Sequence, residues 1–215
     1  MARCGYATAG ASVDDVLQKT TAPRTEAVPP EAVPPEAEAV PHPEGVSNDE
    51  FRAALSRLAA GVVLVTAYDP DDGPNGADAG MTATAFMSVS LDPPLVVVSL
   101  RTGSRMDDLL DEQPMWAASM LSENQVQIAG RFSMKGRISD RLLFEDVSHR
   151  RGEVSGAPLI DGALTVLECR TEQRIVTGDH TLVVGRVLTA SVPGGTGDAG
   201  PLTYFRGKYR QLGKS

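Results

Sequence analysis

The segment from Gly80 to Leu100 (GMTATAFMSVSLDPPLVVVSL) combines small side chains with hydroxyl groups just before a strongly apolar run. Small side chains let a flat heterocycle approach the backbone, so that N–H and C=O groups reach its polar edge, and hydroxyls add donors. The residues of these two kinds are Thr82, Ala83, Thr84, Ala85, Ser88 and Ser90. They indicate a site for a flat ring where a loop enters a strand. An ordinary hydroxyl-rich strand remains the alternative, because threonine is common in strands.

The histidine and cysteine residues give weaker indications of a functional site than this segment does. His180 follows Gly178 and Asp179 in a turn-like stretch, and on the residues alone a structural or solvent-facing role is favoured. Cys169 falls inside an apolar run, where a free cysteine usually acts as a small buried hydrophobe. The two cysteines and three histidines are too scattered for a metal site with Cys/His spacing. We therefore predict no metal site and no cysteine nucleophile.

Strand-like runs separated by turn residues must position these groups. Ser47 and the three residues after it supply helix N-cap candidates, and Phe51, Leu55 and Leu58 recur at helical spacing until Gly61. Short helices are also predicted at 106–110 and 124–131. The predicted strands are 62–68, 86–91, 95–100, 115–121, 164–172 and 181–191, with DPDDGPNG (69–76) as a turn.

This order of elements predicts a mainly β protein whose antiparallel strands form a closed or nearly closed barrel. The strands do not alternate with long helices, and no G-x-G-x-x-G turn occurs, so a Rossmann domain is disfavoured.

The N-terminal residues differ from the rest in composition. The stretch 23–43 repeats Glu-Ala-Val-Pro-Pro, and residues 1–50 carry six of the eight excess negative charges. Proline and like-charged glutamates favour an extended, solvated chain. We predict a disordered tail over 1–46 and one domain over 47–215. This domain is nearly neutral, which argues against a nucleic-acid surface.

The predicted location is the cytoplasm. No run of about 18 apolar residues could span a membrane, and the N-terminus lacks the apolar stretch of a secretory signal. Cys4 lies in the predicted tail, so a framework disulfide is not expected.

The segment MTATAFMSVSLDPPLVVVSL closely resembles the signature of the flavin reductase-like family, whose members form an FMN-binding split β-barrel. Further blocks follow in the family's order. They are LSENQVQIAGRF (121–132), GAPLIDGALTVLEC (156–169), GDH (178–180), GRV (185–187) and PLTYFRGKYRQL (201–212). The resemblance runs from about Phe51 to Leu212 and implies an antiparallel, Greek-key-like split barrel with a few short helices.

The resemblance also implies a placement for the cofactor. Thr82–Ala85 would line the isoalloxazine ring, and Ser88–Ser90 would continue that wall. The turn Arg101–Arg105 would approach the ribityl phosphate, for which hydroxyl and cationic donors are suited. Phe132, Ser133 and Lys135 would close the phosphate or adenine end. His180 would lie beside the flavin and nicotinamide rings in a positioning or electrostatic role.

The binding residues assigned in this way are Thr82, Ala83, Thr84, Ala85, Ser88, Val89, Ser90, Ser99, Arg101, Ser104, Arg105, Phe132, Ser133, Lys135, His180, Tyr204 and Tyr209. For Lys135 a solvated surface lysine is the alternative. Tyr204 and Tyr209, together with Arg206, could contact the dinucleotide, and the alternative for them is a final strand packed on the barrel with exposed charges.

The function implied is an NAD(P)H:flavin oxidoreductase that reduces FMN or FAD with NADH or NADPH. Such proteins generally supply free reduced flavin to a separate flavin-dependent monooxygenase, and family members form homodimers. Two alternatives stay open: a non-catalytic split-barrel protein that only carries or senses flavin, and a related oxidase of a phosphorylated pyridine vitamer. No nucleic-acid or membrane partner is expected.

Overall fold

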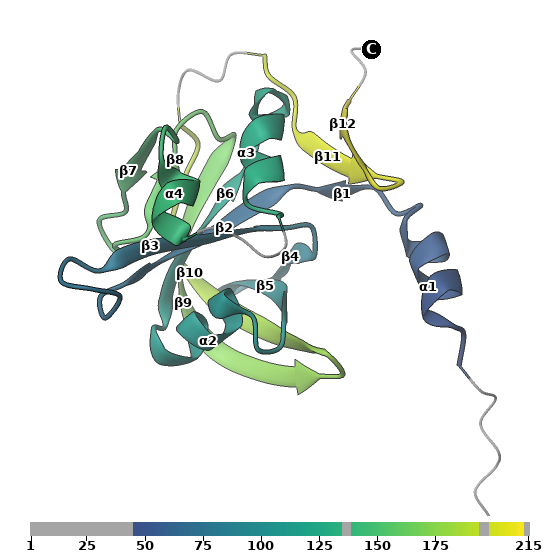
Figure 1. Cartoon of the computed structure of the whole chain (residues 1–215), viewed down its shortest axis with the longest axis horizontal. Coiled ribbons are helices and arrows are strands. Elements are labelled where there is room, and N and C mark those ends of the chain that lie inside the picture. Colours follow the sequence, from purple (N-terminus) through teal and green to yellow (C-terminus); the bar gives the residue numbers. More distant parts are fainter. Residues whose placement is uncertain (1–44, 135–138, 194–197, 213–215) are drawn as a thin grey trace, which may run out of the picture. The chain divides into compact units, whose positions relative to one another are not determined.

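The computed structural model describes residues 45–134, 139–193 and 198–212. The predicted tail therefore lies outside the described residues, apart from its last two. Contacts divide the chain after Gly45, and the unit that begins at Val46 is mainly β with short helices, as predicted (Figure 1). In these residues no helix is long and apolar enough to cross a membrane.

The helices are α1 Asn48–Leu55, α2 Arg105–Glu112, α3 Val126–Arg131 and α4 Asp140–Phe144, with a 3-10 turn at Glu123–Gln125. The strands of the first half are β1 Ala60–Gly61, β2 Val63–Asp69, β3 Ala77–Ala83, β4 Phe86–Leu91, β5 Pro94–Arg101 and β6 Met115–Met120. Those of the second half are β7 His149–Arg151, β8 Pro158–Ile160, β9 Thr165–Thr177, β10 His180–Ser191, β11 Leu202–Phe205 and β12 Lys208–Gln211.

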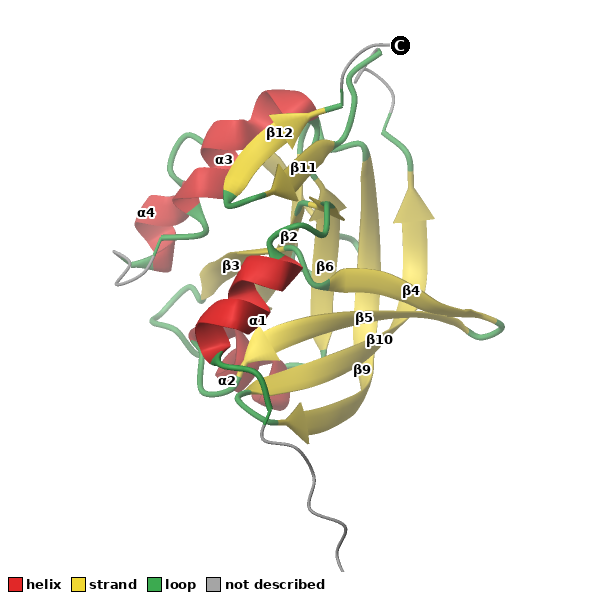
Figure 2. Ribbon diagram, turned by 90° about the vertical axis from the view of Figure 1, so that its right-hand side faces the viewer, coloured by secondary structure: helices red, strands yellow, loops and turns green. Residues whose placement is uncertain are grey.

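Seven strands form one antiparallel sheet in the order β3-β2-β6-β9-β10-β5-β4. The sheet curls until β3, at one end of this order, contacts β5 near the other end (Figure 2). Two smaller antiparallel sheets, β1-β11-β12 and β7-β8, complete the unit. The prediction of antiparallel strands closing on themselves, with few helices, is confirmed.

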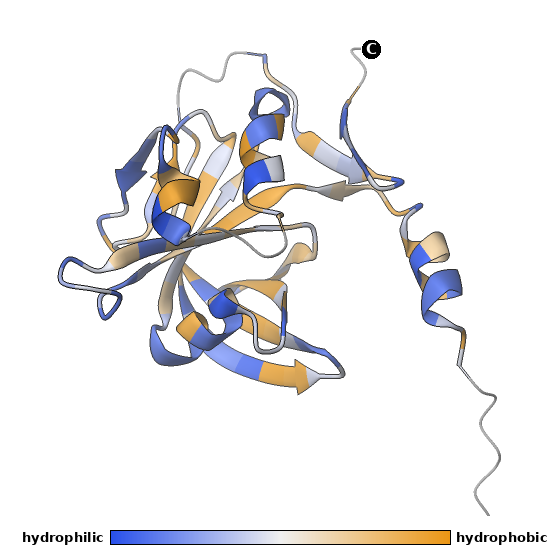
Figure 3. Ribbon diagram, in the orientation of Figure 1, coloured by the Kyte–Doolittle hydropathy of each residue, from blue (hydrophilic) through white to orange (hydrophobic). Residues whose placement is uncertain are grey.

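Strand β2 runs through the middle of the hydrophobic core. Its residues Val63–Ala67 are all buried, because one face packs inside the curled sheet and the other under α3 and α4. A strand buried on both faces needs a continuous apolar run rather than alternation. Figure 3 shows this hydrophobic colouring along much of β2. Trp116 of β6 is fully buried in the same core cluster, which also contains Leu109 and Leu110 of α2.

Helix α1 begins where it was predicted but ends earlier. Ser47 is its N-cap, and its hydroxyl and backbone N–H both bond to Glu50, which forms a capping box. The helix ends at Leu55 rather than at Gly61, because Ala60 and Gly61 are drawn into β1, where they pair with β11. No residue of α1 is buried within the unit.

Glu168 of β9 is a buried carboxylate that anchors the loop between β7 and β8. One oxygen, Oε1, accepts hydrogen bonds from the N–H groups of Val154 and Ser155 (3.0 and 2.7 Å) and from the Ser155 hydroxyl at 2.8 Å. The other oxygen accepts from the Thr189 hydroxyl at 3.0 Å. Burial alone would raise the pKa of Glu168, but these hydrogen bonds together hold it below its usual value.

Glu168→Gln should lower the free energy of unfolding by about 2 kcal/mol near neutral pH, because the neutral amide replaces a charged acceptor of several hydrogen bonds. A carboxylate whose pKa is lowered on folding stabilises the protein above its unfolded pKa of about 4.5. That stabilisation is lost as the pH falls through the lowered folded value. Urea titrations between about pH 7 and pH 3 should therefore show the difference between wild type and variant shrinking.

Glu172→Gln is the matched control on the same strand, because Glu172 pairs with Arg186 at the surface and the loss should stay below about 1 kcal/mol. Equal losses for both variants would contradict the anchoring role of Glu168.

Candidate functional site

A mainly apolar pocket of about 510 Å³ lies beside β5 and β10, against the chain that follows α1. Ser99 of β5 pairs directly with Leu182 of β10 in its floor. The residues that line it are Leu58, Ala59, Ala60, Gly61, Thr84, Ala85, Phe86, Met87, Val97, Ser99 and Leu182. Two of the predicted flavin-wall residues, Thr84 and Ala85, and the predicted Ser99 therefore meet in one cavity.

The wall of the pocket is built where the chain passes from β3 to β4. Pairing of β3 with β2 ends at Ala83, and pairing of β4 with β5 begins at Phe86. Between them, the Ala85 carbonyl accepts the Ser99 N–H at 3.0 Å, which fixes this break against β5. The N–H and C=O of Thr84 make no hydrogen bond to any residue that the structure describes. Small side chains and accessible backbone groups thus occur together, as a flat ligand with a polar edge requires.

His180 and Arg101 continue the same face of the sheet beyond the pocket. His180 is two residues from Leu182 on β10, Arg101 is two residues from Ser99 on β5, and the two lie opposite each other in register. Residues two apart on a strand share a face and lie about 7 Å apart. The His180 side chain is 45% exposed, and its Nδ1 lies 2.8 Å from Asp179 Oδ1. The histidine of the GDH turn therefore lies at the end of the pocket with a cation beside it.

The family model for the flavin reductase like domain matches residues 55–213, most of the chain. This chain belongs to that family. It is 39% identical over 161 residues to an NADH-dependent flavin reductase of a Rhodococcus species, covering 75% of this chain and 84% of that protein. It is 35% identical over 165 residues to the 4-hydroxyphenylacetate 3-monooxygenase reductase component of Thermus thermophilus, covering 76% and 96%.

Solved structures agree with this membership. The Streptomyces globisporus NADH:FAD oxidoreductase SgcE6, in complex with NAD and FAD fragments, superposes with a TM-score of 0.68 at 32% identity. That comparison covers 77% of this chain and 92% of SgcE6. The fold of this flavin reductase-like chain is the split β-barrel that its sequence resembled.

Not all of the predicted wall faces the pocket of this flavin reductase-like chain. Ala83 is buried in the core inside the curled sheet. The Thr82 hydroxyl donates to the Ala129 carbonyl of α3 at 2.8 Å. Ser88–Ser90 run along β4, the last strand of the sheet, and do not line the pocket. Of the predicted wall, Thr84 and Ala85 thus line this pocket, because strand alternation turns successive side chains to opposite faces.

Ser104 and Arg105 also lie differently from the phosphate role assigned to them. Ser104 is the N-cap of α2, and its hydroxyl accepts the Asp107 N–H at 3.3 Å. The Arg105 guanidinium bonds to Asp140 and forms ion pairs with Asp69 and Asp72 at 3.2 and 2.8 Å. A cation shared by three carboxylates has little remaining positive field for a phosphate. Of the predicted cations in the described residues, Arg101 is the one beside the pocket.

The remaining predicted residues lie around the C-terminal hairpin and α3. Phe132 is a core residue, packed edge-to-face on Phe144 at 4.9 Å between ring centroids, so its side chain does not line the pocket. Tyr204 and Tyr209 contact each other edge-to-face across β11 and β12, with 5.4 Å between their centroids. Ser133 lies 3.5 Å from the Tyr209 hydroxyl. None of these lines the pocket, and Lys135 lies outside the described residues.

The sequence interpretation missed the opposite wall of the pocket. Leu58–Gly61 were assigned to the end of a helix, but they line the cavity because α1 stops at Leu55. Leu182 was placed in a strand without a ligand role. Leu182 lies opposite Ser99 because of the register between β10 and β5, which the sequence alone does not predict.

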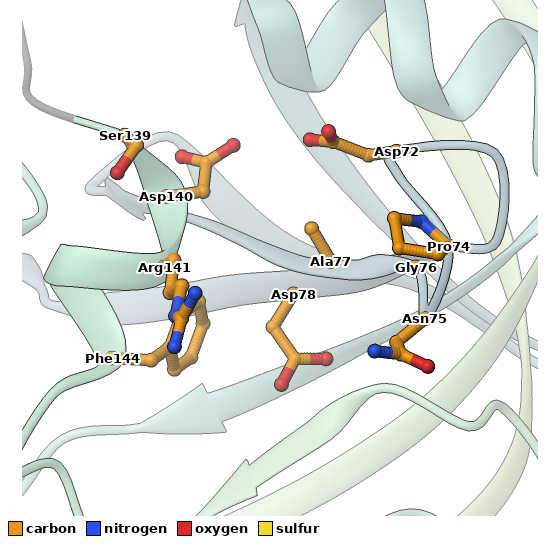
Figure 4. Close-up of a pocket in the computed structure, with 10 residues that line it drawn as sticks. All are labelled: Asp72, Pro74, Asn75, Gly76, Ala77, Asp78, Ser139, Asp140, Arg141 and Phe144. Atoms are coloured by element: carbon orange, nitrogen blue, oxygen red, sulfur yellow. The ribbon is translucent and has the colours of Figure 1, made fainter.

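A second hollow, of about 570 Å³, lies between the β2–β3 turn and α4 (Figure 4). Its charged lining residues are Asp72, Asp78, Asp140 and Arg141, and the signature residues Thr84 and Ala85 are not among the residues that line it. Asp78 is paired with Arg151, and Asp140 with Arg105. Among the residues that the structure describes, no group of three His, Cys, Asp or Glu side chains could hold a metal ion. The Cys169 thiol is buried, and burial raises its pKa to about 12, as suits a packing role.

Proposed function

We propose that this chain is an NAD(P)H:flavin oxidoreductase that reduces FMN or FAD by hydride transfer. The observation that carries the proposal is the pocket beside β5 and β10, where signature residues Thr84 and Ala85 meet Ser99, and where His180 follows two residues from the lining residue Leu182 on the same strand face. Its volume of about 510 Å³ lies in the usual range of small-molecule sites. Arg101, at the same end, supplies a fixed positive charge for a phosphate group.

The substrates carry the chemistry, since nicotinamide C4 gives a hydride to flavin N5, and solvent supplies the proton that completes flavin reduction. The protein's task is to hold the two rings in contact, because fixing two reactants in a productive geometry removes much of the barrier. In this proposal the Thr84 backbone binds the polar edge of the flavin, Ala85 leaves room for the ring, and His180 positions the nicotinamide.

The relatives favour an enzyme over a protein that only carries flavin. Those reported above are named as an NADH-dependent flavin reductase, a monooxygenase reductase component and an NADH:FAD oxidoreductase. A flavin carrier does not need a nicotinamide site, whereas the His180 side chain, two residues along β10 from the pocket, is 45% exposed and able to serve one. None of the relatives reported above is named as an oxidase of a pyridine vitamer.

We further propose a two-component system in which reduced flavin leaves this chain for a separate monooxygenase. The reductase component from Thermus thermophilus supports this assignment. A pocket of small side chains and backbone contacts is compatible with release, because it offers no aromatic ring apart from Phe86 for tight stacking. We place this reaction in the cytoplasm, where the reduced buried thiol of Cys169 is stable.

A homodimer is the proposed assembly. Large apolar side chains stay exposed on α1, on the chain after it and on the edge strand β4. They are Phe51, Leu55, Leu58, Met87, Val89 and Leu91. Leu58 and Met87 both line the apolar pocket, so they share one surface, and a contiguous exposed apolar surface typically marks an interface. Analytical ultracentrifugation should give twice the mass of one chain, and the mass of a single chain would contradict this assembly.

The direct test crosses two flavins with two nicotinamide coenzymes. We expect the purified full chain to oxidise NADH or NADPH, followed by its absorbance, only when FMN or FAD is added. The preferred pair identifies both substrates. Tight flavin binding without any coenzyme oxidation would support the flavin-carrier alternative and reject the oxidoreductase.

A further inference from the structure

The β9–β10 turn, which carries His180, is held firmly against the end of β5. The Asp179 carbonyl accepts the Thr102 N–H at 3.1 Å, and the hydroxyls of Thr102 and Thr181 lie 3.3 Å apart. Gly178 has a φ of +61°, a left-handed conformation that glycine adopts without strain. The backbone on both sides of Asp179 is thus fixed, which limits the groups that its side chain can contact.

The group that the Asp179 side chain contacts is the imidazole of His180. Asp179 Oδ1 lies 2.8 Å from His180 Nδ1, although the Asp179 side chain is 86% exposed and could extend into solvent. The hydrogen bond to His180 lowers the pKa of Asp179, and the positive charge of Arg101 lowers it further, so the carboxylate stays ionised.

An ionised carboxylate has no proton to donate. The bond between Asp179 and His180 therefore requires the proton on Nδ1, and in a neutral imidazole this leaves Nε2 as an acceptor. No hydrogen bond engages His180 Nε2 within the described ranges of the chain. The orientation and the tautomer of the ring are thus both set by one carboxylate.

We propose that Asp179 is a positioning residue, which holds His180 in the Nδ1–H tautomer and presents Nε2 as a hydrogen-bond acceptor toward the dinucleotide. The kinetic part of this inference rests on the proposed function, whereas the tautomer is a property of the protein without ligands. A hydrogen-bonded carboxylate or carbonyl is the usual device for fixing which histidine nitrogen remains available.

The tautomer is measured by long-range nitrogen–proton NMR correlation on the unliganded full chain at about pH 8, where an ordinary imidazole is neutral. The chain has three histidines, and His180→Ala assigns the signal. His149 is an internal reference, because its Nδ1 lies 2.7 Å from the Val147 carbonyl, which can only accept. We expect His180 to show the Nδ1–H pattern, and Asp179→Ala to shift it toward Nε2–H.

Steady-state kinetics test the consequence for the reaction. Asp179→Ala should lower kcat/KM for the coenzyme about 5-fold, the effect expected for one hydrogen bond of ordinary strength, while the flavin Kd stays unchanged. Asp179→Asn keeps an acceptor oxygen and should retain most of the tautomer and of the rate. Because Asp179 acts through His180, the double variant Asp179→Ala/His180→Ala should be no slower than His180→Ala.

Asp71→Ala is the control, since Asp71 is an exposed aspartate in the turn between β2 and β3 whose hydrogen bonds go to Asp69 and Gly73, and no change is expected. An Nε2–H pattern for His180 in the wild type would overturn the inference, whatever the activity. Additive losses in the double variant would overturn the route through His180. The expected tautomer with unchanged kinetics in His180→Ala would instead reject the role of His180 in the proposed function.

Discussion

Ala85→Phe is expected to raise the flavin Kd by about 10- to 100-fold, the cost of placing a bulky side chain in space that a ligand needs. Ala85 lines the apolar pocket and is exposed, so a phenyl ring there meets the cavity rather than the protein core. The fold should therefore persist by circular dichroism. Titration of FMN and FAD, followed by flavin fluorescence, measures the effect.

Two matched variants decide whether the pocket is the cause. Ser88→Phe adds a ring on the strand that follows Ala85, β4, but Ser88 is exposed and does not line the pocket, so flavin affinity should hold. Ala83→Phe should instead unfold the protein more easily, because Ala83 is buried in the core. Wild-type affinity in Ala85→Phe would move the flavin site elsewhere.

The strands with strong apolar character could be predicted from the sequence. Strand β4 occupies the residues expected for it, and helix α2 contains its predicted core. Strand β3 could not be predicted, because Ala77, Asp78 and Gly80 are poor strand formers and the strand exists through its pairing with β2. Residues 173–177, at the end of β9, were not predicted for the same reason, because they form a strand through their pairing with β10.

Only part of the candidate site could be predicted, because local sequence patterns mark some of its residues and long-range packing places the others. Thr84, Ala85, Ser99, Arg101 and His180 come from local blocks whose small or polar residues already mark them, and the structure brings them to one end of β5 and β10. The pocket's second wall depends on where α1 ends, which short-range patterns do not define well.

Arg105 shows the limit most clearly. Its carboxylate partners Asp69, Asp72 and Asp140 lie 33 to 36 positions away in the chain. Ser-Arg after an apolar strand suits a phosphate, and nothing local reveals that three acidic side chains converge on the guanidinium. Long-range convergence of this kind is a product of the fold rather than of the sequence pattern.

Gly185→Ala should lower the free energy of unfolding by about 2–3 kcal/mol, as expected for overpacking a filled core. A Cβ at Gly185 would collide with Trp116 Cζ2 and lie 3.1 Å from Trp116 Cε2 and 3.3 Å from Cys169 Cβ. Trp116 is fully buried and cannot move away easily, and the β9–β10 register shifts at Val184/Gly185. For a unit of this size the melting temperature should fall by roughly 5–10 °C, measured by differential scanning calorimetry.

Gly130→Ala provides the opposite control. Gly130 lies inside α3 with open space around its Cα, so the added methyl group meets nothing and should stabilise the helix by about 0.5–1 kcal/mol. The two variants make the same chemical change and are expected to shift the melting temperature in opposite directions. A melting temperature of Gly185→Ala at or above that of the wild type would show that Trp116 has room to move. Close packing against Trp116 would then not be the reason for a glycine at position 185.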